Sequence, residues 1–169
     1  MKDFPKYALL LIVLMILQIG VLNNLNLGGY INPYIYILFI LVLPFSTPGW
    51  LLLLLSFFVG FIMDYFCNTL GLHMSAAVML AFARPAIIRS ISFGIQDEKS
   101  SPDLAHEGLG WFTRYVAIGV LVHHTTLFLL ETFSFRLFYL TIVRIILSSA
   151  VSIFFIILIE ILRLQRHKD

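Results

Sequence analysis

Two adjacent histidines, His123 and His124, are the side chains best suited to chemistry, and Glu131 shares a helical face with His124. Imidazole and carboxylate groups are common ligands of zinc and iron, and a third histidine, His73, lies elsewhere in the chain. Adjacent histidines, however, point to different faces of a helix, and the repeated histidine boxes of membrane di-iron enzymes are absent. We therefore interpret His123, His124 and Glu131 as a polar pocket inside a helix bundle and predict no metal or other cofactor.

No catalytic motif accompanies these histidines. The sequence contains neither a Gly-x-Ser-x-Gly motif nor a phosphate-binding glycine loop. Many of its serines lie on predicted helices, and none has an obvious base and orienting acid in the sequence that could activate it. We predict no catalytic residues and a protein that is not an enzyme.

Asp64 is the only aspartate, glutamate, lysine or arginine between Lys6 and Arg84. A carboxylate in such an apolar stretch is costly unless it reaches an interface or finds a partner. Ser56 and Gly60 precede it at four-residue intervals, so the three residues share a helical face on which another helix can approach closely. Arg84 is one candidate for the ion-pair partner of Asp64.

Arg144 is the other candidate partner. It begins a second polar stripe, in which Ser148 and Ser152 follow at four-residue intervals. Two interpretations of the stripes remain open. They are helix-packing surfaces with paired charges, or they line a ligand or ion pocket in the outer half of the membrane, between Asp64 and Arg144.

The composition places these residues in a membrane protein. The chain has 169 residues, of which 60% are hydrophobic and 12% charged, and its mean hydropathy is +0.99. Soluble globular domains have about 25% charged residues. The net charge of +2 and the scattered basic residues give no nucleic-acid-binding surface. Cys67 is the only cysteine, so an intrachain disulfide is excluded.

Six segments are apolar enough to be predicted as membrane-spanning helices of one all-α domain, residues 1–169. They are residues 7–22, 33–45, 50–67, 73–93, 111–133 and 137–162. The first is interpreted as a retained helix and not as a cleaved signal peptide. The second is short and is followed by Pro44 and Pro48, so it is either a tilted short span or half of a tight hairpin.

The basic residues indicate the orientation of these spans. With both termini in the cytoplasm, nine of the eleven lysines and arginines lie on the cytoplasmic half, and only Arg136 and Arg144 lie outside. Residues 94–110 then form a cytoplasmic loop, in which Ser-Ser-Pro-Asp could begin a short helix. The basic C-terminus favours contact with anionic lipid.

The segment from Gly60 to His73 (GFIMDYFCNTLGLH) resembles the segment characteristic of MreD, a family of bacterial rod-shape-determining membrane proteins. In that family a glycine, an aspartate, a short polar turn and a Leu-Gly pair join two helices. The length of the chain and its spans agree with this resemblance. The matching residues here are Gly60, Asp64, Leu70 and Gly71.

The resemblance implies a non-enzymatic scaffold of the cell-elongation complex in the bacterial inner membrane. Its main partner would be MreC, within a wider complex of MreB, RodA and the RodA transpeptidase, and a homo-oligomer is left open. The resemblance also implies a compact bundle similar to the substrate-binding subunits of energy-coupling vitamin transporters. A small-molecule-binding subunit of a transporter is therefore the alternative function. Such subunits carry an Ala-x-x-x-Ala seam on the first helix, where this chain has only Ala8.

Overall fold

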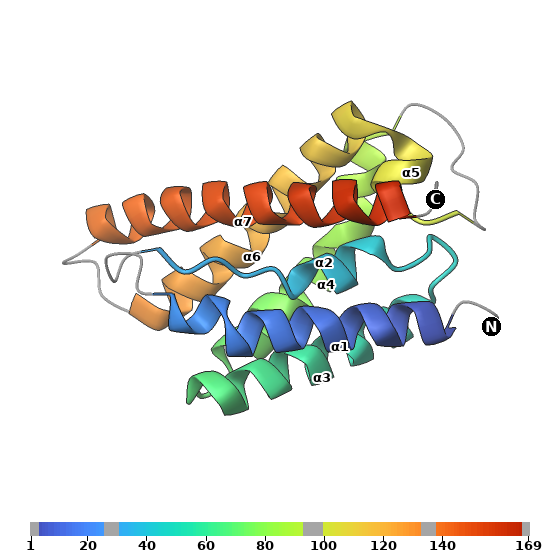
Figure 1. The fold of residues 1–169 in the computed structure, drawn as a ribbon. Coiled ribbons are helices and arrows are strands. Elements are labelled where there is room, and N and C mark those ends of the chain that lie inside the picture. The colour runs from blue at the N-terminus through green and yellow to red at the C-terminus, as the bar shows by residue number, and fades with distance from the viewer. Residues whose placement is uncertain (1–3, 26–30, 93–99, 133–137, 167–169) are drawn as a thin grey trace.

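The described residues of the computed structural model, 4–25, 31–92, 100–132 and 138–166, fold into helices and their connections (Figure 1). In chain order the helices are α1 (Phe4–Gly20), the single 3₁₀ turn η1 (Leu22–Asn24), α2 (Ile37–Val42), α3 (Gly49–Cys67), α4 (Leu72–Ile91), α5 (Leu104–Glu107), α6 (Leu109–Thr132) and α7 (Phe138–Arg166). The prediction of an all-α protein is confirmed for this part of the chain.

Five helices are long and apolar enough to cross a membrane, namely α1 with η1, α3, α4, α6 and α7. They correspond to five of the six predicted spans; residues 93, 133 and 137 at the predicted ends lie outside the described residues. Large apolar side chains on their outward faces are exposed, as expected for helices solvated by lipid. This architecture is that of a multi-pass membrane protein.

The helices run back and forth between two ends of the bundle. The start of α1 and the end of α7 lie at one end, which we call the terminal end (Figure 1). The α3–α4 connection lies at the opposite end, which we call the far end. α4 packs against α3 and α6, and α6 packs against α7.

Residues 33–45 do not form a sixth spanning helix, so that prediction is wrong. The only helix in this segment is the six-residue α2, and residues 32–35 before it are non-helical. Prolines flank the helix on both sides, at Pro33 and Pro44. Pro44 disfavours a helical conformation at Leu43 and so ends α2, and Pro33, which lacks a backbone N–H, prevents a helix from continuing through it toward the N-terminus. We call residues 31–43 the broken segment.

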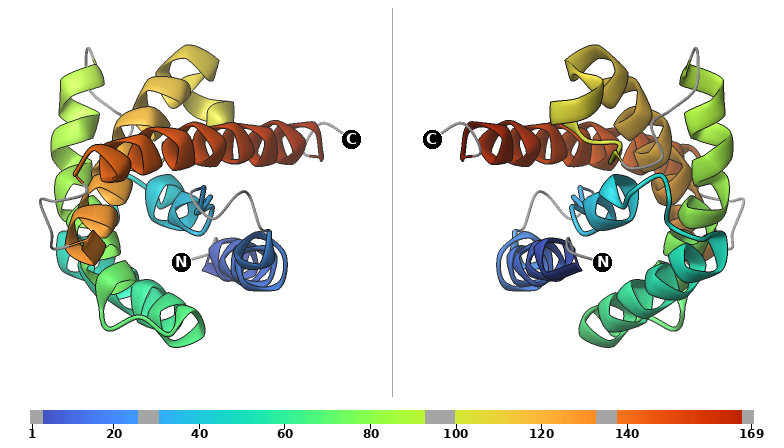
Figure 2. Two further views of the ribbon diagram at one scale, coloured as in Figure 1. Left: turned by 90° about the vertical axis from the view of Figure 1, so that its left-hand side faces the viewer. Right: turned by 90° about the vertical axis from the view of Figure 1, so that its right-hand side faces the viewer.

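The broken segment occupies the centre of the bundle. Every side chain from Pro33 to Leu43 is buried. α2 packs against α1, α3, α4 and α6, and the end-on views show it surrounded by helices (Figure 2). The segment begins at the far end and runs toward the terminal end (Figure 1). A short, irregular stretch of backbone therefore lies where a membrane protein would ordinarily place a regular helix.

α3 and α4 form a tight helical hairpin. At Gly60 an added Cβ atom would lie 2.4 Å from the Cα atom of Met74, so only glycine fits at this crossing. The turn between the helices uses two residues with left-handed backbone conformations, Asn68 (φ 55°) and Gly71 (φ 82°). Asparagine and glycine adopt this conformation most readily. The hairpin therefore depends on residue types at fixed positions.

Part of the predicted loop 94–110 is ordered against the bundle. Residues 94–99 lie outside the described residues. After them, Asp103 caps α5 by accepting from the backbone N–H groups of Ala105 and His106, at 3.1 Å each. The hydroxyl groups of Ser101 and Tyr7 lie 2.5 Å apart and tie this region to α1. The short helix expected after Ser-Ser-Pro-Asp is confirmed.

Candidate functional site

Asp64 is held by the start of α4 and not by a basic side chain. Its carboxylate accepts hydrogen bonds from the backbone N–H groups of His73 (3.0 Å) and Met74 (2.9 Å) and from the Thr69 hydroxyl (2.5 Å). The N-cap residue of α4, Gly71, has no side chain to do this. Asp64 therefore supplies, from the preceding helix, the cap that the first turn of α4 needs. Neither of the two candidate partners within the chain, Arg84 and Arg144, forms an ion pair with Asp64.

Arg84 instead caps the other end of a helix. The buried guanidinium donates to the backbone carbonyls of Leu41 (3.4 Å) and Leu43 at the end of α2. Its Nε also donates to the Tyr115 hydroxyl (2.9 Å), which in turn donates to the Leu41 carbonyl (2.9 Å). The last carbonyls of a helix carry partial negative charge, so a buried cation is stabilised there. Arg84 and Tyr115 thus hold one end of the broken segment.

Side chains of α1 and α7 hold the other end. The backbone N–H of Asn32 donates to the Ser148 hydroxyl (3.0 Å), and that of Tyr34 donates to the Ser152 hydroxyl (2.9 Å). Gln18 on α1 accepts from the N–H of Ile35 at 2.7 Å and donates to the carbonyl of residue 33 at 3.0 Å. Non-helical backbone is tolerated at membrane depth when protein groups satisfy it. The polar stripe of α7 has this role.

The buried histidines form a hydrogen-bonded cluster around Tyr36. The Tyr36 hydroxyl lies 2.6 Å from Nε2 of His123 and 3.2 Å from Nδ1 of His73. His124 belongs to a second set of bonds, with the Ser152 hydroxyl (3.0 Å) and the Val120 carbonyl (3.0 Å). His123 and His124 are fully buried. These histidines therefore position the broken segment as well.

Glu131 lies apart from this cluster and pairs with Arg144. Nη1 of Arg144 lies 2.9 Å from a carboxylate oxygen of Glu131, and the guanidinium also stacks 4.4 Å from the centre of the Phe128 ring. The structure does not bring His123, His124 and Glu131 together: Glu131 lines a cavity at one end of the bundle, and neither histidine is among the residues that line that cavity. Among the described residues, no group of three or more histidine, cysteine, aspartate or glutamate side chains is placed to bind a metal.

The remaining predicted residues have structural positions. Ser56 is buried and donates to the carbonyl of Leu52 in its own helix, while Gly60 makes the close crossing with α4. Leu70, in the turn between α3 and α4, is fully exposed. The face shared by Ser56, Gly60 and Asp64 is thus used within the chain, and Leu70 is the residue of this set that projects outward.

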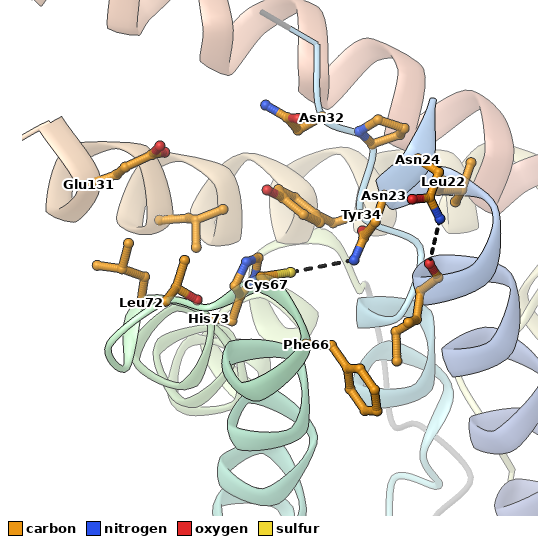
Figure 3. Close-up of a pocket in the computed structure, with 14 residues that line it drawn as sticks. Leu22, Asn23, Asn24, Asn32, Tyr34, Phe66, Cys67, Leu72, His73 and Glu131 are labelled. Carbon is orange, nitrogen blue, oxygen red and sulfur yellow. Dashed lines mark hydrogen bonds between the residues drawn. The ribbon is translucent and has the colours of Figure 1, made fainter. Parts of the chain in front are cut away.

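A cavity of about 520 Å³ opens at the far end, between α1, the broken segment, α3, α4 and α6 (Figure 3). We call it the outer pocket. Asp64 and Arg144 do not line it, contrary to the second interpretation of the polar stripes. Its lining residues are Ile19, Leu22, Asn23, Asn24, Asn32, Pro33, Tyr34, Phe66, Cys67, Thr69, Leu72, His73, Leu127 and Glu131.

Several lining side chains are fixed by bonds to each other. Asn23 accepts from Gln18 (2.8 Å) and donates to the sulfur of Cys67 (3.4 Å). Asn24 donates to the carbonyls of Ile19 and Gly20. The wall at the end of α1 is therefore preformed, and it joins α1 to α3 through the Asn23–Cys67 contact (Figure 3).

Three residues central to the bonds of the broken segment were not among the residues singled out from the sequence. They are Gln18, Tyr36 and Tyr115. Gln18 had a recognisable signal, because it is the only amide in the first predicted span. The tyrosines had none, since tyrosine is common in membrane helices at interfaces. The chain matches no protein-family model, no curated protein and no solved structure.

Proposed function

We propose that this protein is a non-enzymatic membrane scaffold of the bacterial cell-elongation complex, of the MreD kind. One observation carries the proposal. Three internal side chains that could perform chemistry, Asp64, Arg84 and His124, are hydrogen-bonded to the backbone of the chain itself, and His123 bonds to the Tyr36 hydroxyl. A protein whose polar interior is used for its own architecture acts through its surfaces.

The hairpin supports the MreD resemblance in particular. The segment from Gly60 to His73 forms it, and three of the four matching positions have structural roles there. Gly60 allows the close crossing, Asp64 caps α4, and Gly71 takes the left-handed conformation. Leu70, the fourth position, is exposed and available to a partner.

MreC is the proposed main partner, within a complex that includes MreB, RodA and its transpeptidase. The surfaces that remain for such a partner are mostly apolar. α3 exposes Phe57, Phe58 and Phe61, and α1 exposes Leu9 and Ile16. Contacts in the membrane plane suit a single-span partner, because its helix can pack along such faces.

The proposed topology has six passes, with the broken segment making the second, and both termini in the cytoplasm. The broken segment runs from the far end toward the terminal end, which is the direction such a pass requires (Figure 1). Cys67, the only cysteine, lies at the far end of α3 and would face the outside. A membrane-impermeant maleimide should therefore label Cys67 in intact spheroplasts. Labelling only after the membrane is opened would contradict this orientation.

Chemical crosslinking in native membranes, followed by mass spectrometry, tests the function. We expect recovery of the MreC encoded in the same genome, with an unrelated multi-pass protein of similar abundance as the control bait. Equal recovery of MreC by the control bait would argue against specific capture. Recovery of an ATPase-linked membrane subunit in place of MreC would contradict the scaffold.

The outer pocket favours a second candidate, the small-molecule-binding subunit of a transporter. The alanine pattern counts against it. α1 has only Ala8, and the alanine pair Ala77 and Ala81 on α4 is buried inside the bundle, where no coupling subunit can dock. Thermal stabilisation of the purified protein by a vitamin would favour the transporter subunit over the scaffold.

A further inference from the structure

Four polar groups of the outer pocket have no hydrogen-bond partner within the part of the chain that the structure describes. Neither the Asn32 side-chain amide nor the Tyr34 hydroxyl has a hydrogen-bond partner among the described residues. The same holds for the second ring nitrogen of His73 and the second carboxylate oxygen of Glu131. The Tyr34 hydroxyl and the Glu131 carboxylate point toward one another (Figure 3). A preformed cavity with a few convergent polar groups is the usual form of a small-molecule site.

The charge of the lining indicates which ligands fit. Glu131 is the only aspartate, glutamate, lysine or arginine among the described lining residues, and Nη1 of Arg144, outside the lining, lies 2.9 Å from its carboxylate. None of the described lining residues is a lysine or arginine, so among them a phosphate or carboxylate would lie beside a glutamate without a counter-charge. The free groups instead suit neutral hydroxyl and amide groups, which can both donate and accept.

The walls indicate the shape of the ligand. The rings of Tyr34 and His73 meet edge to face at 4.9 Å, and Phe66, Leu72 and Leu127 add apolar surface. The volume of about 520 Å³ lies within the range of about 300–1,000 Å³ typical of small-molecule sites. A ring with an apolar face and a polar edge would contact both kinds of wall.

We propose that the outer pocket binds an uncharged, sugar-like ring that carries hydroxyl and amide groups. The ring packs on the Tyr34 and His73 side of the pocket, and its polar edge bonds to the Tyr34 hydroxyl and to the free groups of Asn32 and Glu131. This inference does not depend on the scaffold function, since a scaffold and a transporter subunit could both carry such a site.

Protection of Cys67 from a maleimide tests the proposal, because this single cysteine lines the pocket. The protein is reconstituted in phospholipid nanodiscs, so that no sugar detergent competes, and the probe is N-acetylglucosamine. At a probe concentration ten times its Kd, labelling should be about tenfold slower. N-acetylmuramic acid, which adds a carboxylate to the same ring, should give much weaker protection.

Tyr34→Phe is the matched variant. It removes a hydroxyl that has no hydrogen-bond partner among the described residues, so thermal stability should be unchanged while protection by N-acetylglucosamine is lost. Tyr139→Phe, at an exposed position outside the pocket, should retain full protection. Glu131→Gln should also abolish protection, and it leaves the aromatic and apolar side chains of the pocket unchanged.

Three results would overturn the proposal. The first is no slowing of Cys67 labelling by N-acetylglucosamine up to its solubility limit. The second is equal protection by N-acetylmuramic acid, which would contradict the argument from charge. The third is protection that survives both Tyr34→Phe and Glu131→Gln, which would place the sugar outside the outer pocket.

Discussion

Replacing Asp64 by alanine should destabilise the protein by removing the cap of α4. In the folded protein the carboxylate accepts from the N–H groups of His73 and Met74 and from the Thr69 hydroxyl. Gly71, at the N-cap position itself, cannot replace it. Asp64→Ala therefore leaves two backbone donors at the start of α4 without an acceptor.

The size of the effect follows from those two donors. A buried donor left unpaired costs about 1–3 kcal/mol. The N–H of His73 is buried and that of Met74 is partly buried, so the second donor regains part of its loss through water. Together the two unpaired donors should lower the free energy of unfolding of Asp64→Ala by about 2–4 kcal/mol. Asp64→Asn keeps one acceptor oxygen and should cost about half as much.

Unfolding of the purified protein by SDS in mixed micelles, followed by circular dichroism, measures this cost. Tyr65→Phe is the matched control, because Tyr65 is the next residue and is 77% exposed. A double-mutant cycle with Arg84→Met distinguishes a cap from an ion pair. Since Asp64 and Arg84 bond to different groups, their effects should add within about 0.5 kcal/mol. Equal stability of Asp64→Ala and Tyr65→Phe, or strong coupling to Arg84, would refute the reasoning.

Three further substitutions test other contacts by the same unfolding assay. Gly60→Ala should lower the free energy of unfolding by about 1–3 kcal/mol or more, because its Cβ atom would lie 2.4 Å from a backbone atom of α4. Gly110→Ala is the control and should leave the stability unchanged, since its Cβ atom would have no atom within contact distance. Arg84→Met should lower the free energy of unfolding by at least about 2–3 kcal/mol, because it leaves carbonyl groups at the end of α2 unpaired. Arg89→Met, at an exposed position, should change it little. Similar values for the two variants would argue against the cap. Tyr36→Phe should cost about 1–3 kcal/mol because it removes the hydroxyl between two buried histidines, and a neutral result would show that this cluster does not stabilise the fold.

The long helices could be predicted because each carries its own signal. An apolar run of about 20 residues must satisfy its backbone internally in lipid, and only a helix does so within one segment. The predicted ends differ from the observed ones by a few residues, as is usual for helix termini. The hairpin turn was also readable, since asparagine and glycine mark left-handed positions.

The broken segment could not be predicted in the same way. Residues 33–45 are apolar enough to suggest a span, but their backbone is satisfied by groups elsewhere in the chain. Ser152 bonds to the N–H of Tyr34, which lies 118 residues away in the sequence. The sequence around residue 34 contains no pattern that identifies Ser152 as the hydrogen-bond partner. The prolines indicated that the helix is interrupted. The hydrogen bonds that satisfy the non-helical backbone are visible only in the three-dimensional structure.

The charged residues were misassigned for a related reason. Sequence reasoning seeks an opposite charge for Asp64 and for Arg84, because an unpaired charge in lipid is costly. In this fold the ends of helices supply the opposite partial charge, through backbone N–H groups for Asp64 and carbonyls for Arg84. A helix end can lie anywhere in space, so no spacing rule finds it.

The bonds of the broken segment also constrain the order in which the protein can be made. Gln18 is synthesised before the segment, but Arg84, Tyr115, Ser148 and Ser152 are synthesised after it. Until α7 has entered the membrane, the backbone N–H groups of Asn32 and Tyr34 lack their partners Ser148 and Ser152 and are unstable in hydrocarbon. The second pass therefore reaches its final depth only at the end of biogenesis, and ribosome-bound chains truncated before residue 148 should leave it accessible to water-soluble reagents.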